Sequence, residues 1–142
     1  MMKLVWVLKK INSMDSSVFY SKILLFGEYG IIEDSKGLSI PYNFFNGALK
    51  FSKLETKDSK KSNKILLQFH KYLSGIPDLD LDLSKFEKDL SNGIFFDSSI
   101  PQGYGVGSSG AIVAAVYDKY AKGKIKISEN LLSIKKLLLF KI

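Results

Sequence analysis

The chain has 142 residues, of which 46% are hydrophobic and 13% are aromatic. This length and composition suit one folded domain with its own core and exclude a disordered chain. The net charge of +7 comes from lysine alone, because the sequence has no arginine. The lysines are spread along the whole chain, so we expect no nucleic-acid partner. Without cysteine and with a single histidine, the sequence excludes disulfides, thiolate metal sites and multi-histidine centres. No apolar run reaches the roughly 18 residues of a spanning helix, so we expect no membrane partner and a cytoplasmic location.

The N-terminal part predicts a leader followed by strands. Residues 1–13 are apolar and basic, and Met14 is a second candidate start, so we expect this leader to lie outside the core. The apolar and aromatic run Val18–Phe26 predicts a buried strand. Two further strands are expected at Leu38–Ile40 and Ala48–Leu54, where apolar and polar residues alternate.

The middle of the chain predicts a loop and then a helix. The charged stretch 55–61 is expected to be a loop. Apolar residues recur at helical spacing over Ile65–Leu73, with Ser62 or Asn63 as the cap and Gly75 as the stop.

Several residues after Leu66 could be given a functional role, but a structural explanation is simpler for each of them. His70 lies beside the apolar stripe of the helix, and we expect it to be structural. The alternating carboxylates of 78–83 indicate a solvated strand face or loop rather than a metal site. Ser84 and Glu87 are expected to form a capping box for a short helix that ends at Asn92.

A strand over Ile94–Ile100 is expected to lead into the most informative stretch of the chain. Gly103, Gly105 and Gly107 stand at alternate positions, and small and apolar residues over 108–117 predict a helix directly after them. A glycine-rich loop that opens onto a helix N-terminus presents unpaired N–H groups and the positive end of the helix dipole. The sequence therefore predicts a phosphate-binding loop.

The type of nucleotide loop has to be chosen among known patterns. No lysine follows the last glycine, so the loop is not of the Walker A type. Gly105–Gly110 spells G-x-G-x-x-G, and Glu129 follows about 20 residues later, as a dinucleotide-dependent oxidoreductase would require. Ser108 and Ser109 have hydroxyls suited to capping the helix, donating to phosphate or binding Mg²⁺.

Two stretches resemble motifs of the GHMP kinase family. Residues 101–111 follow the pattern P-x-G-x-G-x-G-S-S-[AG]-A of its central motif. Residues 21–30 resemble its first motif, a strand that contains a lysine, here Lys22, and runs into G-E-H, with Tyr29 in place of the histidine. The spacing from lysine to glutamate is similar to that of the mevalonate-kinase-like members.

The resemblance implies an α+β fold of the ribosomal-protein-S5-domain-2-like type, the N-terminal domain of these kinases. It assigns 14–142 to that domain, with the helix over 128–142 truncated and the C-terminal ferredoxin-like domain missing. The chain would then be a fragment, since family members are roughly twice as long.

The resemblance also implies a site for ATP and Mg²⁺. Lys22 would be a catalytic residue beside the transferred phosphoryl group, and Glu28 and Tyr29 would contact the substrate. Ser109 would bind the metal. The residues assigned to the nucleotide are Ser98, Gly103, Tyr104, Gly105, Val106, Gly107, Ser108 and Ser109.

The implied function is transfer of the ATP γ-phosphoryl group to a hydroxyl of a small metabolite, mevalonate or a related compound. The catalytic aspartate and the acidic Mg²⁺ ligand of the family have no counterpart in this chain, so we expect little or no activity from it alone. A homodimer or a complementing C-terminal chain is the expected partner. The alternatives are a non-catalytic nucleotide-binding module and the oxidoreductase fragment.

Overall fold

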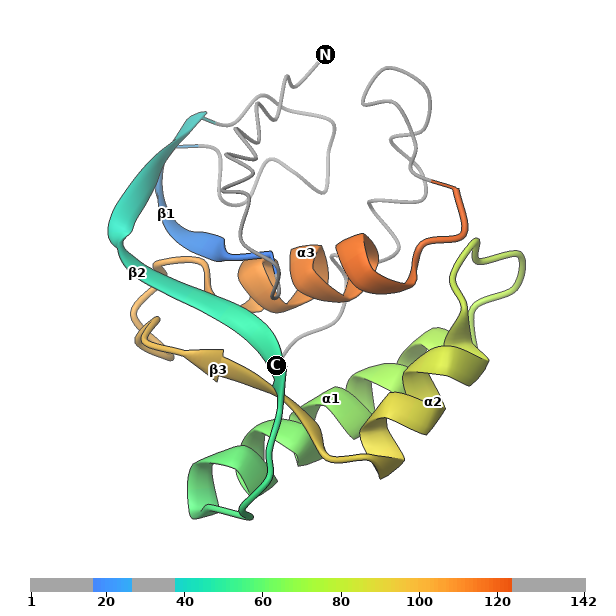
Figure 1. Cartoon of the computed structure of the whole chain (residues 1–142). Helices are drawn as coiled ribbons and strands as arrows, with labels where there is room; N and C mark the ends of the chain where they lie inside the picture. The colour runs from blue at the N-terminus through green and yellow to red at the C-terminus, as the bar shows by residue number, and fades with distance from the viewer. Residues whose placement is uncertain (1–16, 27–37, 124–142) are drawn as a thin grey trace.

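The computed structural model describes residues 17–26 and 38–123 and places three strands and three helices in them (Figure 1). In chain order these are β1 Phe19–Phe26, β2 Leu38–Phe51, α1 Lys57–Ser74, α2 Leu83–Ser91, β3 Ile94–Ser98 and α3 Ser108–Tyr120. The strands form an antiparallel sheet in the order β1-β2-β3. The α+β class is thus confirmed for this part of the chain. The leader over 1–13, the residues Glu28 and Tyr29, and the C-terminal helix expected at 128–142 lie outside the described residues.

β2 is one long strand where two short strands were predicted. Its first part pairs with β1, from Phe26 opposite Leu38 to Phe19 opposite Gly47, and its last part pairs with β3. Pro41 is tolerated because β3 does not reach it, so its missing N–H leaves no gap in the pairing with that strand. The strand ends at Phe51, earlier than predicted.

Gly47 stands where the two halves of β2 meet, and a close approach requires glycine there. A Cβ at this position would lie 2.4 Å from Cζ of Phe96 and 2.9 Å from Cβ of Ser98. The ring of Phe96 therefore packs directly on the backbone of β2, which leaves no room for a side chain at Gly47.

α1 begins earlier than predicted. Thr56 is its N-cap, and the Thr56 hydroxyl accepts the Ser59 N–H at 3.1 Å while the Ser59 hydroxyl accepts the Thr56 N–H at 2.9 Å. The predicted loop over 55–61 and the predicted caps Ser62 and Asn63 were wrong, because the charged residues form the exposed side of the first helical turns. The predicted stop is confirmed, since Gly75 is the C-cap.

α1 is fixed to its neighbours by polar side chains on its inner side. Ser62 both donates to the carbonyl of Phe96 and accepts its N–H. The amide of Asn63 donates to the carbonyl oxygens of Leu90 and Ile94. The residues predicted as caps are therefore bridges from α1 to α2 and β3.

α2 also starts two residues earlier than the sequence suggested. Its N-cap is Asp82, whose carboxylate accepts the Lys85 N–H at 2.9 Å, so the capping box predicted at Ser84 and Glu87 was wrong. The helix ends at the C-cap Asn92, as predicted. His70 has the structural role expected of it, because its Nε2 lies 3.1 Å from the carbonyl oxygen of Leu83.

The helices cover one face of the sheet, and the core lies between the two layers. α3 packs on β1 and β2, whereas α1 packs on β3 and lies beside α2 (Figure 1). The strands contribute Phe19, Leu49, Ile94 and Phe96 to the core. The helices contribute Leu66, Phe69, Leu73, Phe86, Leu90, Ala111, Ile112, Val113, Ala115, Val116 and Tyr120. Among the described residues, no helix is both long and apolar enough to cross a membrane.

Candidate functional site

The glycine-rich loop leaves β3 and turns into α3. Gly103, Gly105 and Gly107 have φ angles of +82°, +69° and +85°, a region in which glycine avoids the steric cost of a Cβ. α3 begins at Ser108 with Gly107 as its N-cap, and no side chain caps the helix. The serines therefore do not serve as caps, and the first turn of α3 offers backbone N–H groups at the end of the loop.

The end of the loop is attached to β1. The backbone N–H of Lys22 donates to the carbonyl oxygen of Val106 at 2.9 Å. The Lys22 stem also packs on Gly107, where a Cβ would lie 2.7 Å from Cγ of Lys22. The proximity of Lys22 to the loop, expected from the resemblance, is thus observed in the structure.

The hydrogen bond between Lys22 and Val106 fixes one peptide plane of the loop. In a trans peptide the C=O and N–H point in opposite directions. Since the Val106 carbonyl points at β1, the N–H of Gly107 points away from it. The strand therefore fixes the direction of the Gly107 N–H but does not accept a hydrogen bond from it.

The root of the loop is attached to β2 by contacts that the sequence did not suggest. The Ser99 N–H donates to the Asn46 carbonyl at 2.9 Å, and the Ser99 hydroxyl accepts the Asn46 N–H at 3.1 Å. The Ser98 hydroxyl accepts the Ile100 N–H at 3.0 Å and donates to the Asn46 carbonyl at 3.4 Å. Ser98, assigned to the nucleotide by the resemblance, thus has local partners. These contacts could not be predicted from the sequence, because serines are common at strand ends and no pattern connects Ser98 and Ser99 with Asn46.

The outer part of the loop is exposed. Tyr104 is 80% exposed, and a Cβ at Gly103 or Gly105 would meet no atom within 4 Å. Val106, Ser108 and Ser109 are half-buried. The loop therefore has an open outer surface between two attached ends.

The charge next to the loop comes from Lys22. Its side chain is half-buried, and burial lowers the pKa of its amine below the usual 10.5. Desolvation disfavours the ammonium form, so an anionic group placed beside it would relieve that cost. Within the described ranges, no three histidine, cysteine, aspartate or glutamate side chains are placed to hold a metal ion.

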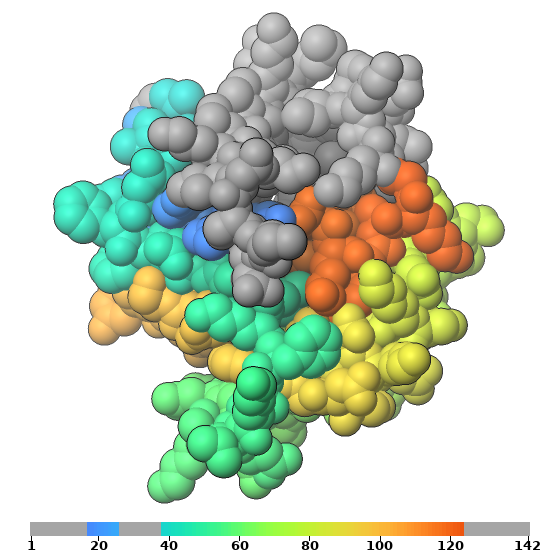
Figure 2. All heavy atoms as spheres, viewed as in Figure 1, coloured from blue at the N-terminus to red at the C-terminus, as the bar shows by residue number. Residues whose placement is uncertain are grey.

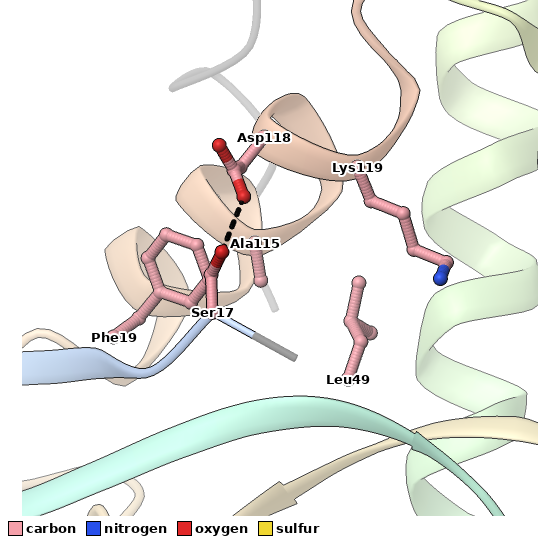
Figure 3. A pocket seen from close by; sticks show the side chains of 6 residues that line it. All are labelled: Ser17, Phe19, Leu49, Ala115, Asp118 and Lys119. Atoms are coloured by element: carbon pink, nitrogen blue, oxygen red, sulfur yellow. Dashed lines mark hydrogen bonds between the residues drawn. The ribbon is translucent and has the colours of Figure 1, made fainter. Parts of the chain in front are cut away.

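A hollow of about 240 Å³ lies at the C-terminal half of α3, and none of the predicted site residues lines it (Figure 3). Phe19, Leu49 and Ala115 form its apolar wall, and the Ser17 hydroxyl donates to the Asp118 carboxylate there at 2.7 Å. The amine of Lys119 points away from Asp118 in Figure 3. The carboxylate of Asp118 would repel a phosphate, so this hollow does not suit the ligand predicted for the loop.

No protein-family model, no curated protein and no solved structure matches the chain.

The geometry distinguishes the kinase-type loop from the dinucleotide loop. A dinucleotide fold places its glycine loop after a strand of a parallel sheet, in a strand–helix–strand unit. β3, the strand before this loop, pairs antiparallel with β2. The arrangement thus does not suit the oxidoreductase alternative.

Proposed function

We propose that this chain is the nucleotide-binding part of a small-molecule kinase of the GHMP type, similar to mevalonate kinases. In this proposal the loop over 103–109 holds the ATP phosphates, and Lys22 lies beside them. The observation that carries the proposal is the hydrogen bond of 2.9 Å from the Lys22 N–H to the Val106 carbonyl. It joins the two stretches that resemble the family motifs, although they lie far apart in the sequence.

The backbone of the loop suits a polyphosphate. The N–H of Gly107 points away from β1, and the first-turn N–H groups of α3 have no side-chain cap to compete with a phosphate oxygen. Gly103 and Gly105 leave room for close approach because no side chain stands over them. Ser108 and Ser109 would add hydroxyl donors beside the same oxygens.

The residues of this chain also fit a metal–nucleotide complex, though only in part. Ser109 would supply one hydroxyl oxygen, and Mg²⁺ in such sites takes most other ligands from phosphates and water. The metal, when bound, would neutralise charge on the phosphate oxygens. The acidic ligand and the general base would have to come from another part of the enzyme or a complementing chain.

Lys22 would have the role of a charge next to the reacting phosphoryl group. Because burial lowers its pKa, its ammonium form would be favoured most when the phosphates are present. The substrate would be a small metabolite with a hydroxyl group, mevalonate or a related compound, and Glu28 and Tyr29 are its proposed contacts.

Calorimetric titration with Mg·ATP tests the proposal. We expect wild-type binding, and a loss of about tenfold or more in Ser109→Ala and in Gly105→Val, whose side chain would stand over the loop. Gly75→Ala is the matched control, because Gly75 has a negative φ and an added Cβ meets only ordinary contacts at 3.5 Å. Absence of wild-type binding to Mg·ATP, or tighter binding of NADH, would refute the proposal.

The non-catalytic module remains the second candidate, because the described residues hold no acidic metal cluster. A coupled assay of ADP release with mevalonate separates the two functions. We expect little turnover from this chain alone and turnover after a C-terminal kinase domain is added. Mg·ATP binding without turnover in that mixture would favour the non-catalytic module.

A further inference from the structure

The exposed side of α1 carries a basic stripe. Five lysines lie there, and all are exposed: Lys57, Lys60, Lys61, Lys64 and Lys71. At 3.6 residues per turn they fall within about 100° of the helix circumference and span about 21 Å of its length. The opposite side holds the buried residues Ser59, Leu66, Phe69 and Leu73. The fold therefore gathers lysines on one face, although the sequence shows them spread along the chain.

This stripe works against the stability of the helix that carries it. Lysines three or four positions apart repel one another on a helix surface, and four such pairs occur here. They are Lys57–Lys60, Lys57–Lys61, Lys60–Lys64 and Lys61–Lys64. The lysines of the first two turns also lie at the positive end of the helix dipole.

Acidic residues offset this repulsion only in part. Glu55 pairs with Lys60 at 2.7 Å, and Asp58 lies in the first turn. Both groups of the Glu55–Lys60 pair are well exposed, so water screens their attraction. A feature that conflicts with local stability is typical of a binding surface, and here it calls for an anionic partner.

Two exposed leucines lie next to the lysines. Leu67 is 54% exposed and stands three residues after Lys64 and four before Lys71, so it shares their face. Leu54 is 81% exposed and lies just before the helix. The first turns of α1, in green, project at the lower end of the molecule in Figure 2.

We propose that this face of α1 binds an anionic lipid surface. Lysines attract anionic headgroups, and exposed leucines gain from insertion at the boundary with the acyl chains. A flat membrane surface can contact a straight stripe of side chains along its length. Nucleic acid fits less well, because the chain has no arginine and the leucines would face a polar phosphate backbone. The proposal departs from the expectation of no membrane partner. That expectation rested on the lack of a spanning apolar run and not on the lysine face of α1.

Vesicle co-sedimentation with the full chain tests the proposal. We expect binding to phosphatidylcholine vesicles that contain about 30% phosphatidylglycerol, and none to phosphatidylcholine alone. Raising the salt from about 0.1 M to about 0.5 M should release the protein. The variant K57Q/K61Q/K64Q should bind about a hundredfold more weakly.

A charge-matched variant provides the control. K85Q/K88Q/K122Q removes three exposed lysines outside α1 and should lose much less affinity. An equal loss in both variants would overturn the stripe as the binding face. Retained binding in L54S/L67S would overturn leucine insertion, and tighter binding to duplex DNA than to the anionic vesicles would overturn a lipid partner.

A second measurement needs no ligand. If the stripe carries a stability cost, K57Q/K61Q/K64Q should unfold at a higher temperature than the wild type in low salt, with a smaller gain in high salt. K85Q/K88Q/K122Q should show no such gain. A destabilised K57Q/K61Q/K64Q would overturn the cost on which the proposal rests.

Discussion

The contact between Gly107 and Lys22 leads to a prediction that compares two glycines of one loop. Gly105 and Gly107 both have positive φ angles, +69° and +85°. Alanine at either position therefore pays the cost of the left-handed region, about 1–2 kcal/mol. The two sites differ in what a new Cβ would meet. At Gly105 nothing lies within 4 Å, whereas at Gly107 Cγ of Lys22 lies at 2.7 Å and its backbone N at 3.3 Å.

The extra crowding sets the expected difference in the free energy of unfolding. Forcing a methyl group into a packed contact costs about 1–3 kcal/mol. Gly105→Ala should thus lower the free energy of unfolding by about 1–2 kcal/mol, and Gly107→Ala by about 2–5 kcal/mol. Urea unfolding followed by far-UV circular dichroism measures both values.

A double-mutant cycle assigns the difference to Lys22. Lys22→Ala removes Cγ, the nearest atom, so the cost of Gly107→Ala should fall by about 1–2 kcal/mol in the double variant. The same background should leave the cost of Gly105→Ala unchanged. Equal costs for the two glycines, or a cycle with no coupling, would refute the close contact between β1 and the loop.

Three further predictions test packing, hydrogen bonding and charge. Gly47→Ala should lower the free energy of unfolding by about 1–3 kcal/mol, since its Cβ would lie 2.4 Å from the Phe96 ring, and Phe96→Leu should recover part of it; urea unfolding measures both. Tyr120→Phe should cost about 1–3 kcal/mol in a thermal melt, because the buried hydroxyl donates to Asp89 at 2.9 Å. Wild-type stability should rise as the pH approaches 10.5 from below. Burial lowers the pKa of Lys22 in the folded chain, so between the folded and the unfolded pKa the unfolded chain binds more protons. Lys22→Met should lack that rise in urea unfolding at several pH values, and an identical pH slope would contradict the pKa shift.

Local signals in the sequence predicted where several elements lie. The apolar run at β1, the stops at Gly75 and Asn92, and the start of α3 at Ser108 depend on neighbouring residues, and their positions agree with the structure. The burial predicted for the run was only partly right, because Val18 and Leu25 are exposed. The positive φ angles of the loop follow from the glycines themselves. These features need no knowledge of distant parts of the chain.

Long-range contacts decided the features that local signals missed. β2 continues through Pro41 and Gly47 because β1 and β3 pair with different parts of it, which no local window shows. The early start of α1 depends on the pairing of Thr56 with Ser59, in a stretch whose charge suggested a loop. For the site, no periodicity connects Lys22 with the glycine loop, and only the resemblance to a kinase family placed them together.

The two attachments of the loop explain how an exposed segment is held in position. Its root is bonded to β2 through Ser99 and Asn46, and its end is bonded to β1 through Val106 and Lys22. β1 and β2 pair with each other on both sides of a register shift between Tyr20 and Ser21, so both attachments belong to the same pair of strands. Ordering a free loop around a ligand costs roughly 1–2 kcal/mol for each residue fixed. Here both ends of the loop are already fixed, so the ligand that we propose would have to order only the exposed residues 102–105.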